Sequence, residues 1–265
     1  MARSVSVNKL FNNALPVSEL FELIGAIWLS LYHSVRDGLR LRINQREFWD
    51  KAWQVGNASL LTVILTSLSI GMVSSLQLVK HFAAYGALSS IGGANALAQI
   101  REMAPVVTSL VLIGRVGSAW AAEIGSMKMT DQLSALQVMK LSWQEFLITP
   151  RVLSCMLLLP ALDLVALTAT LTGGYLIADV MVGLSIHTYV DSIPAFIDGY
   201  DLLVTLVKSM IFGWLVAAIA CFYGFQAHGG TIGVGRYTTK AVVAALLAIF
   251  VVNFVLSFVF YSLFG

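Results

Sequence analysis

Charged residues are scarce in this sequence. Only 11% of its 265 residues are Asp, Glu, Lys or Arg, whereas about a quarter of the residues of a soluble globular protein are charged. Hydrophobic residues make up 58% of the chain, and its mean hydropathy is +0.84. This composition excludes an ordinary soluble domain and predicts an integral membrane protein. The net charge of +2 is too small to predict binding to nucleic acid.

Residues that build disulfide frameworks and metal sites are also few. The two cysteines, Cys155 and Cys221, lie in apolar segments and are predicted to be buried thiols. No secretory signal peptide is visible, because the residues before the first long apolar run are polar and basic. The histidines are scattered and predict no metal site: they are His33, His81, His187 and His228.

The sequence lacks the motifs of a membrane-embedded enzyme. It has no HExxH motif, no His-rich box and no paired Asp motif. The glycine-rich segment HGGTIGVGR (228–236) lacks the Gly-Lys-Ser/Thr ending that grips nucleotide phosphates. We therefore expect a tight cytoplasmic turn there, and we expect the chain to bind no metal and no cofactor of its own.

Long apolar runs are what the sequence has in abundance. A helix that crosses a membrane needs roughly 20 mostly apolar residues, and five runs reach this length. The sequence therefore predicts an all-α integral membrane protein with five transmembrane helices. These spans are predicted at about residues 55–79, 96–121, 152–178, 202–225 and 239–264.

Basic residues predict the orientation of the spans, because cytoplasmic loops are enriched in Lys and Arg. With the N-terminus in the cytoplasm, only Lys80, Arg101 and Lys208 of the 16 basic residues fall toward the outside. The loop between spans three and four contains several aspartates and no basic residue. We therefore expect a cytoplasmic N-terminus and a C-terminus on the outer side.

Residues 1–54 precede the five-span domain, which is predicted to cover residues 55–265. Within them, the segment 16–42 has an apolar core that is too short to cross a membrane, and arginines follow it. This pattern is typical of a helix that lies in the membrane interface. A short sixth span is the alternative, but it would reverse the charge bias of everything downstream. The apolar residues that recur at helical spacing are Phe21, Ile24, Trp28 and Leu31.

A cytoplasmic segment joins spans two and three. Its part KMTDQLSALQVMK (128–140) has the pattern of a short amphipathic helix, with Thr130 as the N-cap and Asp131 in the first turn. Such a helix could receive force from a soluble motor or could lie on the lipid headgroups, and periodicity does not separate the two. The segment, about 123–141, contains the candidate coupling residues Glu123, Lys128, Asp131, Leu133, Leu136 and Met139.

One long segment carries a resemblance to a known family. The run REMAPVVTSLVLIGRVGSAWAAEIGSMKMTDQLSALQVM (101–139) resembles the signature region of the MlaE family, the permease subunits of MCE-associated ABC lipid transporters. Further blocks resemble the family in the same order and spacing. They are SIGMVSSLQL (69–78), TPRVLSCMLLLPAL (149–162), LVKSMIFGW (206–214) and GGTIGVGRYTTKAVV (229–243).

The resemblance implies a fold and a set of partners. It implies an interfacial helix, five spans, a homodimer, and a coupling helix that docks on a separate ABC ATPase, where ATP is used. It also implies an MCE-domain substrate-binding protein on the outer side and, in many bacteria, a STAS-domain subunit. The chain would then be a permease subunit without enzymatic activity. It would move phospholipids or related lipids between membranes, in a bacterial inner membrane with its C-terminus in the periplasm.

Polar residues near the outer ends of the spans are candidates for lipid contact, because polar groups inside a membrane are costly and often functional. Glu102 and Lys208 both lie roughly 26 Å from the inner ends of their spans at 1.5 Å per residue, so we expect them to pair. Arg101 or Lys208 would favour a headgroup phosphate. In the alternative, Arg101 and Glu102 only anchor or brace the helices. The resemblance implies an outward-open lipid cavity near Ser74, Gln77, Leu78, Tyr85, Arg101, Glu102 and Lys208.

Asp163 stands apart from these residues, in the middle of span three. It follows Pro160, at which we expect a kink. A hydrogen bond from Asp163 to a neighbouring helix is the expected arrangement, and proton carriage is the alternative.

Two other functions stay open at this point. A membrane-embedded lipid-modifying enzyme would need a nucleophile and a base, or a metal cluster, near the interface. A passive helical scaffold or channel fits the composition, but it gives the coupling-like segment and the intramembrane charges no role. Co-purification with an ATPase would separate the permease from both alternatives.

Overall fold

The computed structural model of the chain describes residues 22–30, 32, 36, 45–140 and 142–264. These residues form helices joined by short turns, and they contain no strand. Five helical runs are long and apolar enough to cross a membrane, which confirms the predicted all-α fold with five spans. In chain order the runs are Gln45–Ala84, Leu88–Met129, Gln144–Val182, Gly199–Gln226 and Gly230–Ser262.

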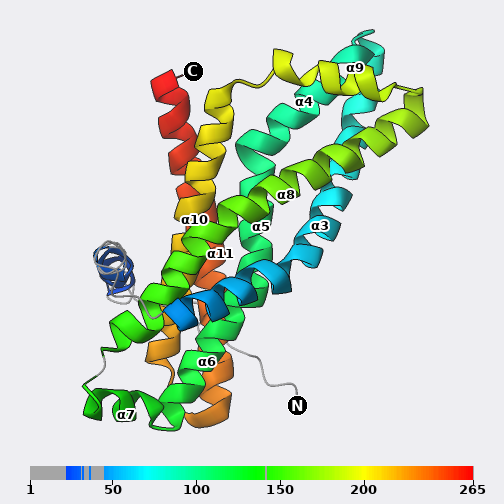
Figure 1. Cartoon of the computed structure of the whole chain (residues 1–265). Coiled ribbons are helices and arrows are strands. Elements are labelled where there is room, and N and C mark those ends of the chain that lie inside the picture. Colours follow the sequence, from blue (N-terminus) through cyan, green and yellow to red (C-terminus); the bar gives the residue numbers. More distant parts are fainter. Residues whose placement is uncertain (1–21, 31, 33–35, 37–44, 141, 265) are drawn as a thin grey trace, which may run out of the picture.

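The first and third spans contain the two long helices α3 (Gln45–Ala84) and α8 (Thr149–Val182). They lie side by side in Figure 1, and their contact is the most extensive between any two described helices. With 40 residues, α3 is about 60 Å long and exceeds the ~30 Å hydrocarbon core of a bilayer. It begins before the predicted start of span one, so residues 45–54 are its first turns. The α8 helix continues through Pro160.

Small residues allow α3 and α8 to approach closely. A Cβ atom on Gly71 of α3 would overlap the carbonyl group of Thr170 on α8. A Cβ atom on Gly173 of α8 would likewise overlap the carbonyl group of Leu68 on α3. Such close backbone contact is a usual basis of helix association in membranes, where burial of apolar surface between helices contributes little. The two glycines therefore set the distance between α3 and α8.

The second span consists of three α-helices separated by π-helical turns. Pro105 accounts for the π-turn before α5. Proline has no N–H group, and its ring clashes with the carbonyl group four residues earlier, which here is that of Arg101. Single π-turns inside α-helices occur frequently at functional sites. The elements are α4 (Ile91–Ala98), a π-turn (Gln99–Met103), α5 (Ala104–Leu112), a π-turn (Ile113–Gly117) and α6 (Ser118–Met129).

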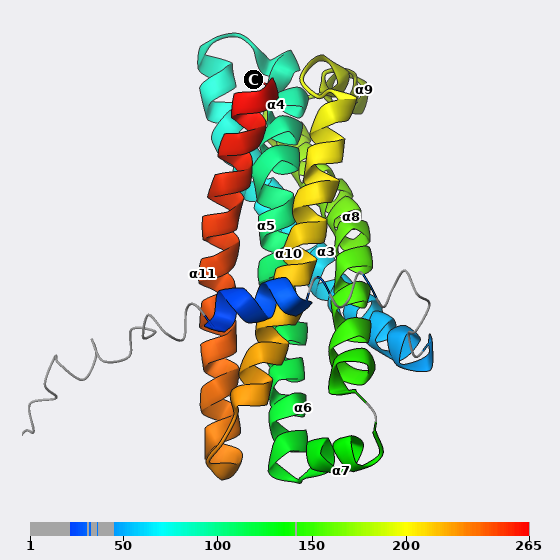
Figure 2. The same cartoon turned by 90° about the vertical axis from the view of Figure 1, so that its left-hand side faces the viewer.

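The fourth and fifth spans, α10 (Gly199–Gln226) and α11 (Gly230–Phe264), complete the bundle. The α10 helix is central, since 61% of its most apolar stretch is buried, whereas the corresponding fraction for α11 is 17%. The main hydrophobic core forms where α6, α8 and α10 meet, and Trp120, Leu159 and Phe212 are fully buried in it. In Figure 2, α11 lies at one side of this group, with an apolar surface left uncovered.

Different short helices lie at the two ends of the bundle (Figure 1). The α7 helix (Gln132–Val138) follows α6 at one end, and α9 (Ile186–Asp191) joins α8 to α10 at the other; we call these the α7 end and the α9 end. The last residues of α11 lie at the α9 end. Tyr189 anchors α9 on α4, because its buried hydroxyl group accepts a hydrogen bond from Asn95 Nδ2 at 2.9 Å. Burial raises the pKa of the Tyr189 hydroxyl group above its usual range.

The start of α7 differs from the prediction. Thr130 is not an N-cap, because its Oγ1 donates to the carbonyl group of Ser126 at 3.1 Å, at the end of α6. Asp131 precedes the first helical residue with a φ of 58°, and its side chain caps no N–H group. The physical reason is that α6 continues as far as Met129. Thr130 and Asp131 therefore form the turn between two helices, and a short polar residue such as Asp tolerates the left-handed conformation.

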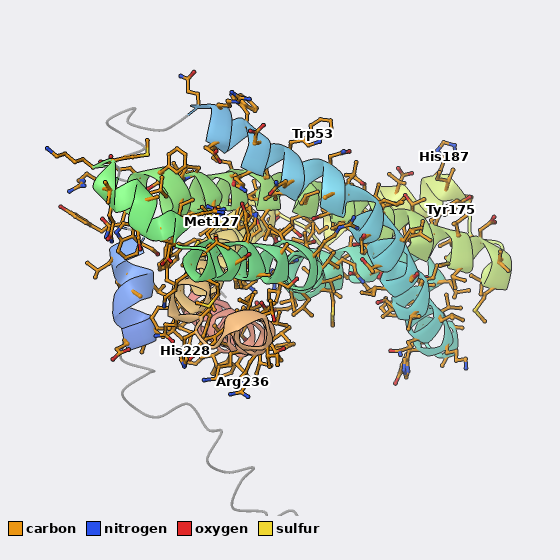
Figure 3. All side chains as sticks on the ribbon, turned by 90° about the horizontal axis from the view of Figure 1, so that it is seen from below. Trp53, Met127, Tyr175, His187, His228 and Arg236 are labelled. Carbon is orange, nitrogen blue, oxygen red and sulfur yellow. The ribbon has the colours of Figure 1, made fainter. Side chains whose placement is uncertain are left out.

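The glycine-rich segment 228–236, predicted as a turn, is mostly helical. The α10 helix ends at Gln226 and α11 begins at Gly230, so only residues 227–229 connect them. Gly229 and Gly230 have φ values of 89° and 69°, which glycine adopts at little cost. Figure 3 views the molecule from the α7 end, with His228 and Arg236 near this turn and His187 far from it.

A helix over residues 22–30 lies crosswise to α10 (Figure 2). Trp28 packs edge to face on Trp214 of α10, with ring centroids 6.2 Å apart. The Trp214 Nε1 group donates to Ser30 Oγ at 3.3 Å. This helix coincides with part of the predicted interfacial helix, 16–42. Residues 16–21, 31, 33–35 and 37–42 of that prediction lie outside the described ones. Its location in a membrane interface stays a prediction.

Candidate functional site

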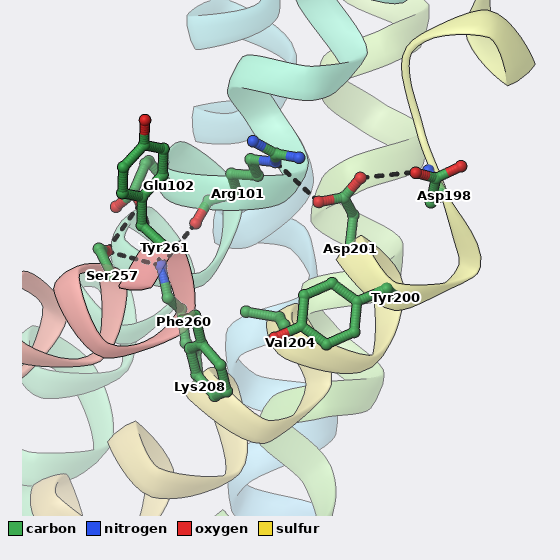
Figure 4. Close-up of a pocket in the computed structure, with 10 residues that line it drawn as sticks. All are labelled: Arg101, Glu102, Asp198, Tyr200, Asp201, Val204, Lys208, Ser257, Phe260 and Tyr261. Carbon is green, nitrogen blue, oxygen red and sulfur yellow. Dashed lines mark hydrogen bonds and ion pairs between the residues drawn. The ribbon is translucent and has the colours of Figure 1, made fainter. Parts of the chain in front are cut away.

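A pocket of about 360 Å³ opens among three elements near the α9 end (Figure 4). The π-turn before α5, the first turns of α10 and the last turns of α11 form its walls. Charged, hydroxylated and aromatic side chains therefore share one small volume. The residues that line it are Arg101, Glu102, Asp198, Tyr200, Asp201, Val204, Lys208, Ser257, Phe260 and Tyr261.

The predicted pairing of Glu102 and Lys208 is confirmed. Lys208 Nζ lies 3.1 Å from Glu102 Oε1, and the Lys208 side chain is 1% exposed whereas that of Glu102 is 43% exposed. Two residues of α11 complete the arrangement around the carboxylate. Ser257 Oγ donates to Glu102 Oε1 at 2.8 Å, and Asn253 Nδ2 donates to Glu102 Oε2 at 2.8 Å. A charge inside the bundle is thus compensated by one ion pair and two hydrogen bonds.

Pro105 also supplies Lys208 with a second acceptor. Because a proline has no N–H group, the carbonyl group of Arg101 loses the usual helical donor four residues later. Lys208 Nζ donates to this carbonyl oxygen at 2.8 Å and to Ser257 Oγ at 2.8 Å. The Lys208 ammonium group, which has three donors, therefore contacts the π-turn and α11 together.

Arg101 lies beside this pair and connects the π-turn to the start of α10. Its Nε donates to Asp201 Oδ1 at 2.7 Å. The Arg101 side chain is 52% exposed, whereas that of Asp201 is 6% exposed. Asp201 Oδ2 accepts from the backbone N–H of Asp198 at 3.1 Å, as part of a capping box at the first turn of α10. The half-exposed guanidinium group of Arg101 consequently faces the pocket from a fixed position.

Sequence reasoning missed Asp201, Asn253 and Ser257 at this site. A signal for the last two exists, because they are polar residues four positions apart in an otherwise apolar span. Residues with this spacing lie on one face of a helix. Asp201 is one of several aspartates between the predicted spans three and four, and nothing in its local pattern indicates Arg101 as its partner.

The candidate residues of α3 do not line this pocket. Ser74 Oγ accepts from Gln99 Nε2 at 3.1 Å, and Leu78 packs in a small cluster near the α9 end. Gln77 is exposed, and Tyr85 follows the end of α3 with 86% of its surface exposed. Within the described part of the chain, the structure brings Arg101, Glu102 and Lys208 into one pocket and leaves the four α3-side residues apart from it. Their contact with a lipid stays a prediction.

A second charged group lies toward the α7 end and joins three helices. Glu123 of α6 pairs with Lys51 of α3 at 2.9 Å and with Arg151 of α8 at 3.0 Å. The Lys51 and Arg151 side chains are only 7% and 1% exposed, whereas that of Glu123 is 40% exposed. Glu123 is therefore not simply solvated, and it holds two buried cations together. We call these three residues the inner triad.

Trp120 supports the inner triad from the hydrophobic core. The Arg151 guanidinium carbon lies 5.8 Å from the centre of the Trp120 ring, within the range of a cation–π interaction. Trp120 Nε1 in turn donates to Gln54 Oε1 of α3 at 3.1 Å. Arg151 Nη1 also donates to the Leu147 carbonyl oxygen at 2.8 Å. Through these contacts the beginning of α8 is tied to α3 and α6.

The other candidate coupling residues lie around α7. Lys128 Nζ donates to the carbonyl group of Phe225 at 2.6 Å, which ties the end of α6 to the end of α10. Leu133 and Leu136 are partly buried, whereas Met139, just after α7, is 68% exposed. Asp131 is exposed in the turn before the helix. The α7 helix thus projects from the end of the bundle, directly after α6 in the chain. The same α6 helix contains Glu123 of the inner triad.

The hydrogen bond expected for Asp163 is not formed. Asp163 is 1% exposed, and neither of its carboxyl oxygens has a hydrogen-bond partner among the described residues. The Thr108 hydroxyl group of α5 is close enough to interact with it, but this group donates to the Ala104 carbonyl oxygen at 2.8 Å. The intrahelical bond satisfies the hydroxyl proton of Thr108, which is why Asp163 is left without a donor.

Comparison with known proteins identifies the family of the chain. The family model described as permease MlaE matches residues 48–259. A probable ABC transporter permease protein of Synechocystis is 39% identical over 242 residues, which cover 91% of this chain and 89% of that protein. A probable ABC transporter permease protein of Rickettsia bellii is 33% identical over 208 residues, which cover 78% of this chain and 80% of that protein.

A plant protein is similar over a shorter share of its length. The chloroplastic protein trigalactosyldiacylglycerol 1 of Arabidopsis thaliana is 39% identical over 224 residues, which cover 84% of this chain and 64% of the plant protein. The matched region of the family model includes the π-turn of the pocket, the inner triad and α7. The chain is an integral membrane protein that belongs to the MlaE family of permeases.

Proposed function

We propose that this permease moves phospholipids or related lipids between membranes as a subunit of an ABC transporter. The observation that carries the proposal is the pocket near the α9 end, where the half-exposed Arg101 lies beside the neutralised pair of Glu102 and Lys208. The pair cancels its own charge, and Asp201 accepts from Nε of Arg101, so the two terminal nitrogens of the half-exposed Arg101 guanidinium group are the donors that would bind an anionic headgroup. Guanidinium groups suit phosphate and carboxylate because their donors match two oxygens at once.

The apolar part of the pocket suits the other end of an amphiphile. Val204 and Phe260 line it together with Tyr200 and Tyr261, and acyl chains need such walls. The name of the Arabidopsis relative contains that of a glycolipid with a diacylglycerol moiety, which supports a glycerolipid as cargo. The α3 residues Ser74, Gln77, Leu78 and Tyr85 would extend the binding surface once a second copy of the chain completes the cavity.

ATP hydrolysis would take place on a separate ABC ATPase that binds α7. The supporting observation is the position of α7, which projects from the end of the bundle with Leu133 and Leu136 only partly covered and Met139 exposed. The relatives from Synechocystis and Rickettsia are named as ABC transporter permeases, and such permeases work with an ATPase. The α7 end would then face the cytoplasm, and the end of α11 would face the periplasm of a bacterial inner membrane.

The inner triad would carry force from α7 to the rest of the bundle. Glu123 lies on α6, the helix that leads directly into α7, and its partners lie on α3 and α8. A displacement of α7 by the ATPase would therefore move three helices together. We further propose a homodimer that works with an MCE-domain protein on the outer side and, in many bacteria, with a STAS-domain subunit.

The experiment that tests the proposal is purification of the tagged chain from its own host in mild detergent. ATPase activity and bound lipid, identified by mass spectrometry, are measured in the eluate. We expect both with the native chain, and we expect Leu133→Asp with Leu136→Asp to lose the ATPase activity but keep the lipid. Ser134→Asp, on the exposed side of α7, is the matched control and should keep both.

Two results would contradict the proposal. If the native chain is isolated without an ATPase and without lipid, the scaffold or channel interpretation is the better one. If the isolated chain converts the lipid chemically, the enzyme interpretation is the better one.

A further inference from the structure

A second cavity, of about 290 Å³, lies between the N-terminal helix and the bundle. Its walls come from residues 22–30, from the beginning of the third span, and from the last turns of α10. The side chains that form them are mostly apolar, and they include Leu29, Trp143, Ala218 and Phe222. None of its lining residues is charged. This cavity is separate from the polar pocket, with which it shares no lining residue.

The surroundings of the cavity indicate contact with lipid. Leu29, which lines the cavity, is 59% exposed. Trp28 and Tyr32 of the same helical segment are 64% and 63% exposed, so this segment presents an aromatic and apolar surface. Trp and Tyr are enriched where a protein meets the boundary between hydrocarbon and headgroups. Trp143, on the opposite wall, packs on Phe225 with ring centroids 4.7 Å apart. We therefore expect the cavity to lie at the level where a membrane lipid has its ester groups and the upper part of its acyl chains.

One polar group in the cavity wall lacks a partner. The Thr149 side chain is completely buried, and its hydroxyl oxygen has no hydrogen-bond partner among the described residues. A buried polar group without a partner costs about 1–3 kcal/mol, so such a group in a cavity wall requires an explanation. A ligand that is apolar but has one acceptor oxygen would satisfy Thr149 and fill the cavity.

We propose that this cavity binds the ester end of one acyl chain of a resident phospholipid from the leaflet on the α7 side. The Thr149 hydroxyl group donates to the ester carbonyl oxygen, and the first methylene groups of the chain lie against Leu29, Ala218 and Phe222. The rest of the lipid extends into the bilayer, since the volume is too small for a whole phospholipid. This lipid is distinct from the cargo, and its binding does not depend on the proposed transport activity.

The bound lipid would hold the N-terminal helix against the bundle. Trp143 follows the segment that joins α7 to the third span, and Phe222 lies near the end of α10. A lipid bound between these residues and the N-terminal helix fixes that helix to the bundle at the end where α7 projects.

The test uses the full chain, with its co-purifying subunits, in nanodiscs of phosphatidylethanolamine and phosphatidylglycerol. A trace of phosphatidylethanolamine with a diazirine near the carbonyl end of one acyl chain is added, and crosslinked peptides are mapped by mass spectrometry. We expect crosslinks in the peptides that contain Trp143 and Phe222, with or without ATP. Ala218→Phe, which fills the cavity, should abolish them. Ala161→Phe, at an exposed position of α8, is the matched control and should leave them unchanged.

Thr149→Val is the second variant, because it keeps the shape of the side chain and removes only the hydroxyl group. Loss of one hydrogen bond should reduce crosslinking about fivefold while the protein remains folded, as judged by size-exclusion chromatography. Absence of crosslinks at these peptides in the native chain would overturn the proposal, and so would crosslinks that persist in Ala218→Phe. Because the readout needs neither ATP hydrolysis nor lipid transfer, a failure of the proposed function would leave this result unaffected.

Discussion

Lys208 Nζ and Glu102 Oε1 lie 3.1 Å apart, although the two residues are separated by 106 positions in the chain. Lys208 is almost fully buried, whereas Glu102 is half-exposed to the pocket. A buried ammonium group without a counter-charge is unfavourable in the hydrocarbon region of a membrane. The carboxylate therefore stabilises the fold and at the same time lowers the net charge that a ligand in the pocket experiences.

We predict that Glu102→Gln destabilises the protein more than Lys208→Met does. The first change leaves the buried Lys208 without its carboxylate, whereas the second leaves Glu102 with its donors Ser257 and Asn253. Removing one partner of a buried pair costs about 3–5 kcal/mol, and the exposure of Glu102 reduces the expected loss to about 2 kcal/mol. Thermal unfolding in detergent measures both variants, and equal midpoints would contradict the prediction.

The reversed pair tests direct contact. Glu102→Lys combined with Lys208→Glu should recover part of the stability that each single change loses, because the two charges remain adjacent. No recovery in the double variant would mean that the surrounding groups, rather than the pair, determine the stability.

We predict that Lys51→Met separates ATP hydrolysis from lipid transport. Arg151 still pairs with Glu123 in this variant, so the protein should fold, but the ion pair between α6 and α3 is lost. Coupling free energies of 1–3 kcal/mol correspond to roughly 5–150-fold effects, and we expect lipid transferred per ATP to fall about fivefold or more. Transfer between vesicles and phosphate release, measured on the same preparation, give this ratio. Lys80→Met, at an exposed position of α3 outside the coupling segment, should leave it unchanged.

We predict that Gly71→Ala disturbs the contact between α3 and α8. The added Cβ atom would overlap the Thr170 carbonyl group, so the helices must move apart. Overpacking of this kind costs about 1–3 kcal/mol. Gly114→Ala is the control, because a Cβ atom there meets no neighbouring atom within 4 Å. The difference in unfolding midpoint between the two variants measures the cost, and no difference would show that the glycine contact is dispensable.

We predict that Asp163→Leu makes the protein more stable. Its carboxyl oxygens are buried without hydrogen-bond partners among the described residues, so replacing the group removes a cost of about 1–3 kcal/mol. If lipid transport persists in this variant, Asp163 carries no proton in the transport cycle. A loss of transport in both Asp163→Leu and Asp163→Asn, with stability retained, would instead support proton carriage.

Much of the architecture follows from local pattern. The long apolar runs are sufficient to locate five spans, because a helix is the way in which a single segment satisfies its backbone groups in lipid. The ends of the helices were predicted less well. The α3 helix starts at Gln45, well before its apolar core, and α6 runs to Met129, because a helix continues into water wherever its residues allow it.

The polar site shows the limit of such reasoning more clearly. Matched depth was enough to pair Glu102 with Lys208, because the rise per residue of a helix is constant. The partners Asp201, Asn253 and Ser257 depend on how α10 and α11 are rotated and tilted against the π-turn, and depth contains no information about rotation.

The sequence by itself determined that the protein lies in a membrane, that it crosses the membrane with five helices, and which of its polar residues need an explanation. These properties depend on composition and on periodicity along one segment at a time. Only the tertiary structure decided that Glu123 joins Lys51 to Arg151 and that Asp163 has no hydrogen-bond partner among the described residues. It also decided that a mostly apolar cavity, lined in part by Thr149, lies between the N-terminal helix and the bundle. Such contacts arise between segments that are distant in the chain, and their geometry follows from close packing of helices against one another.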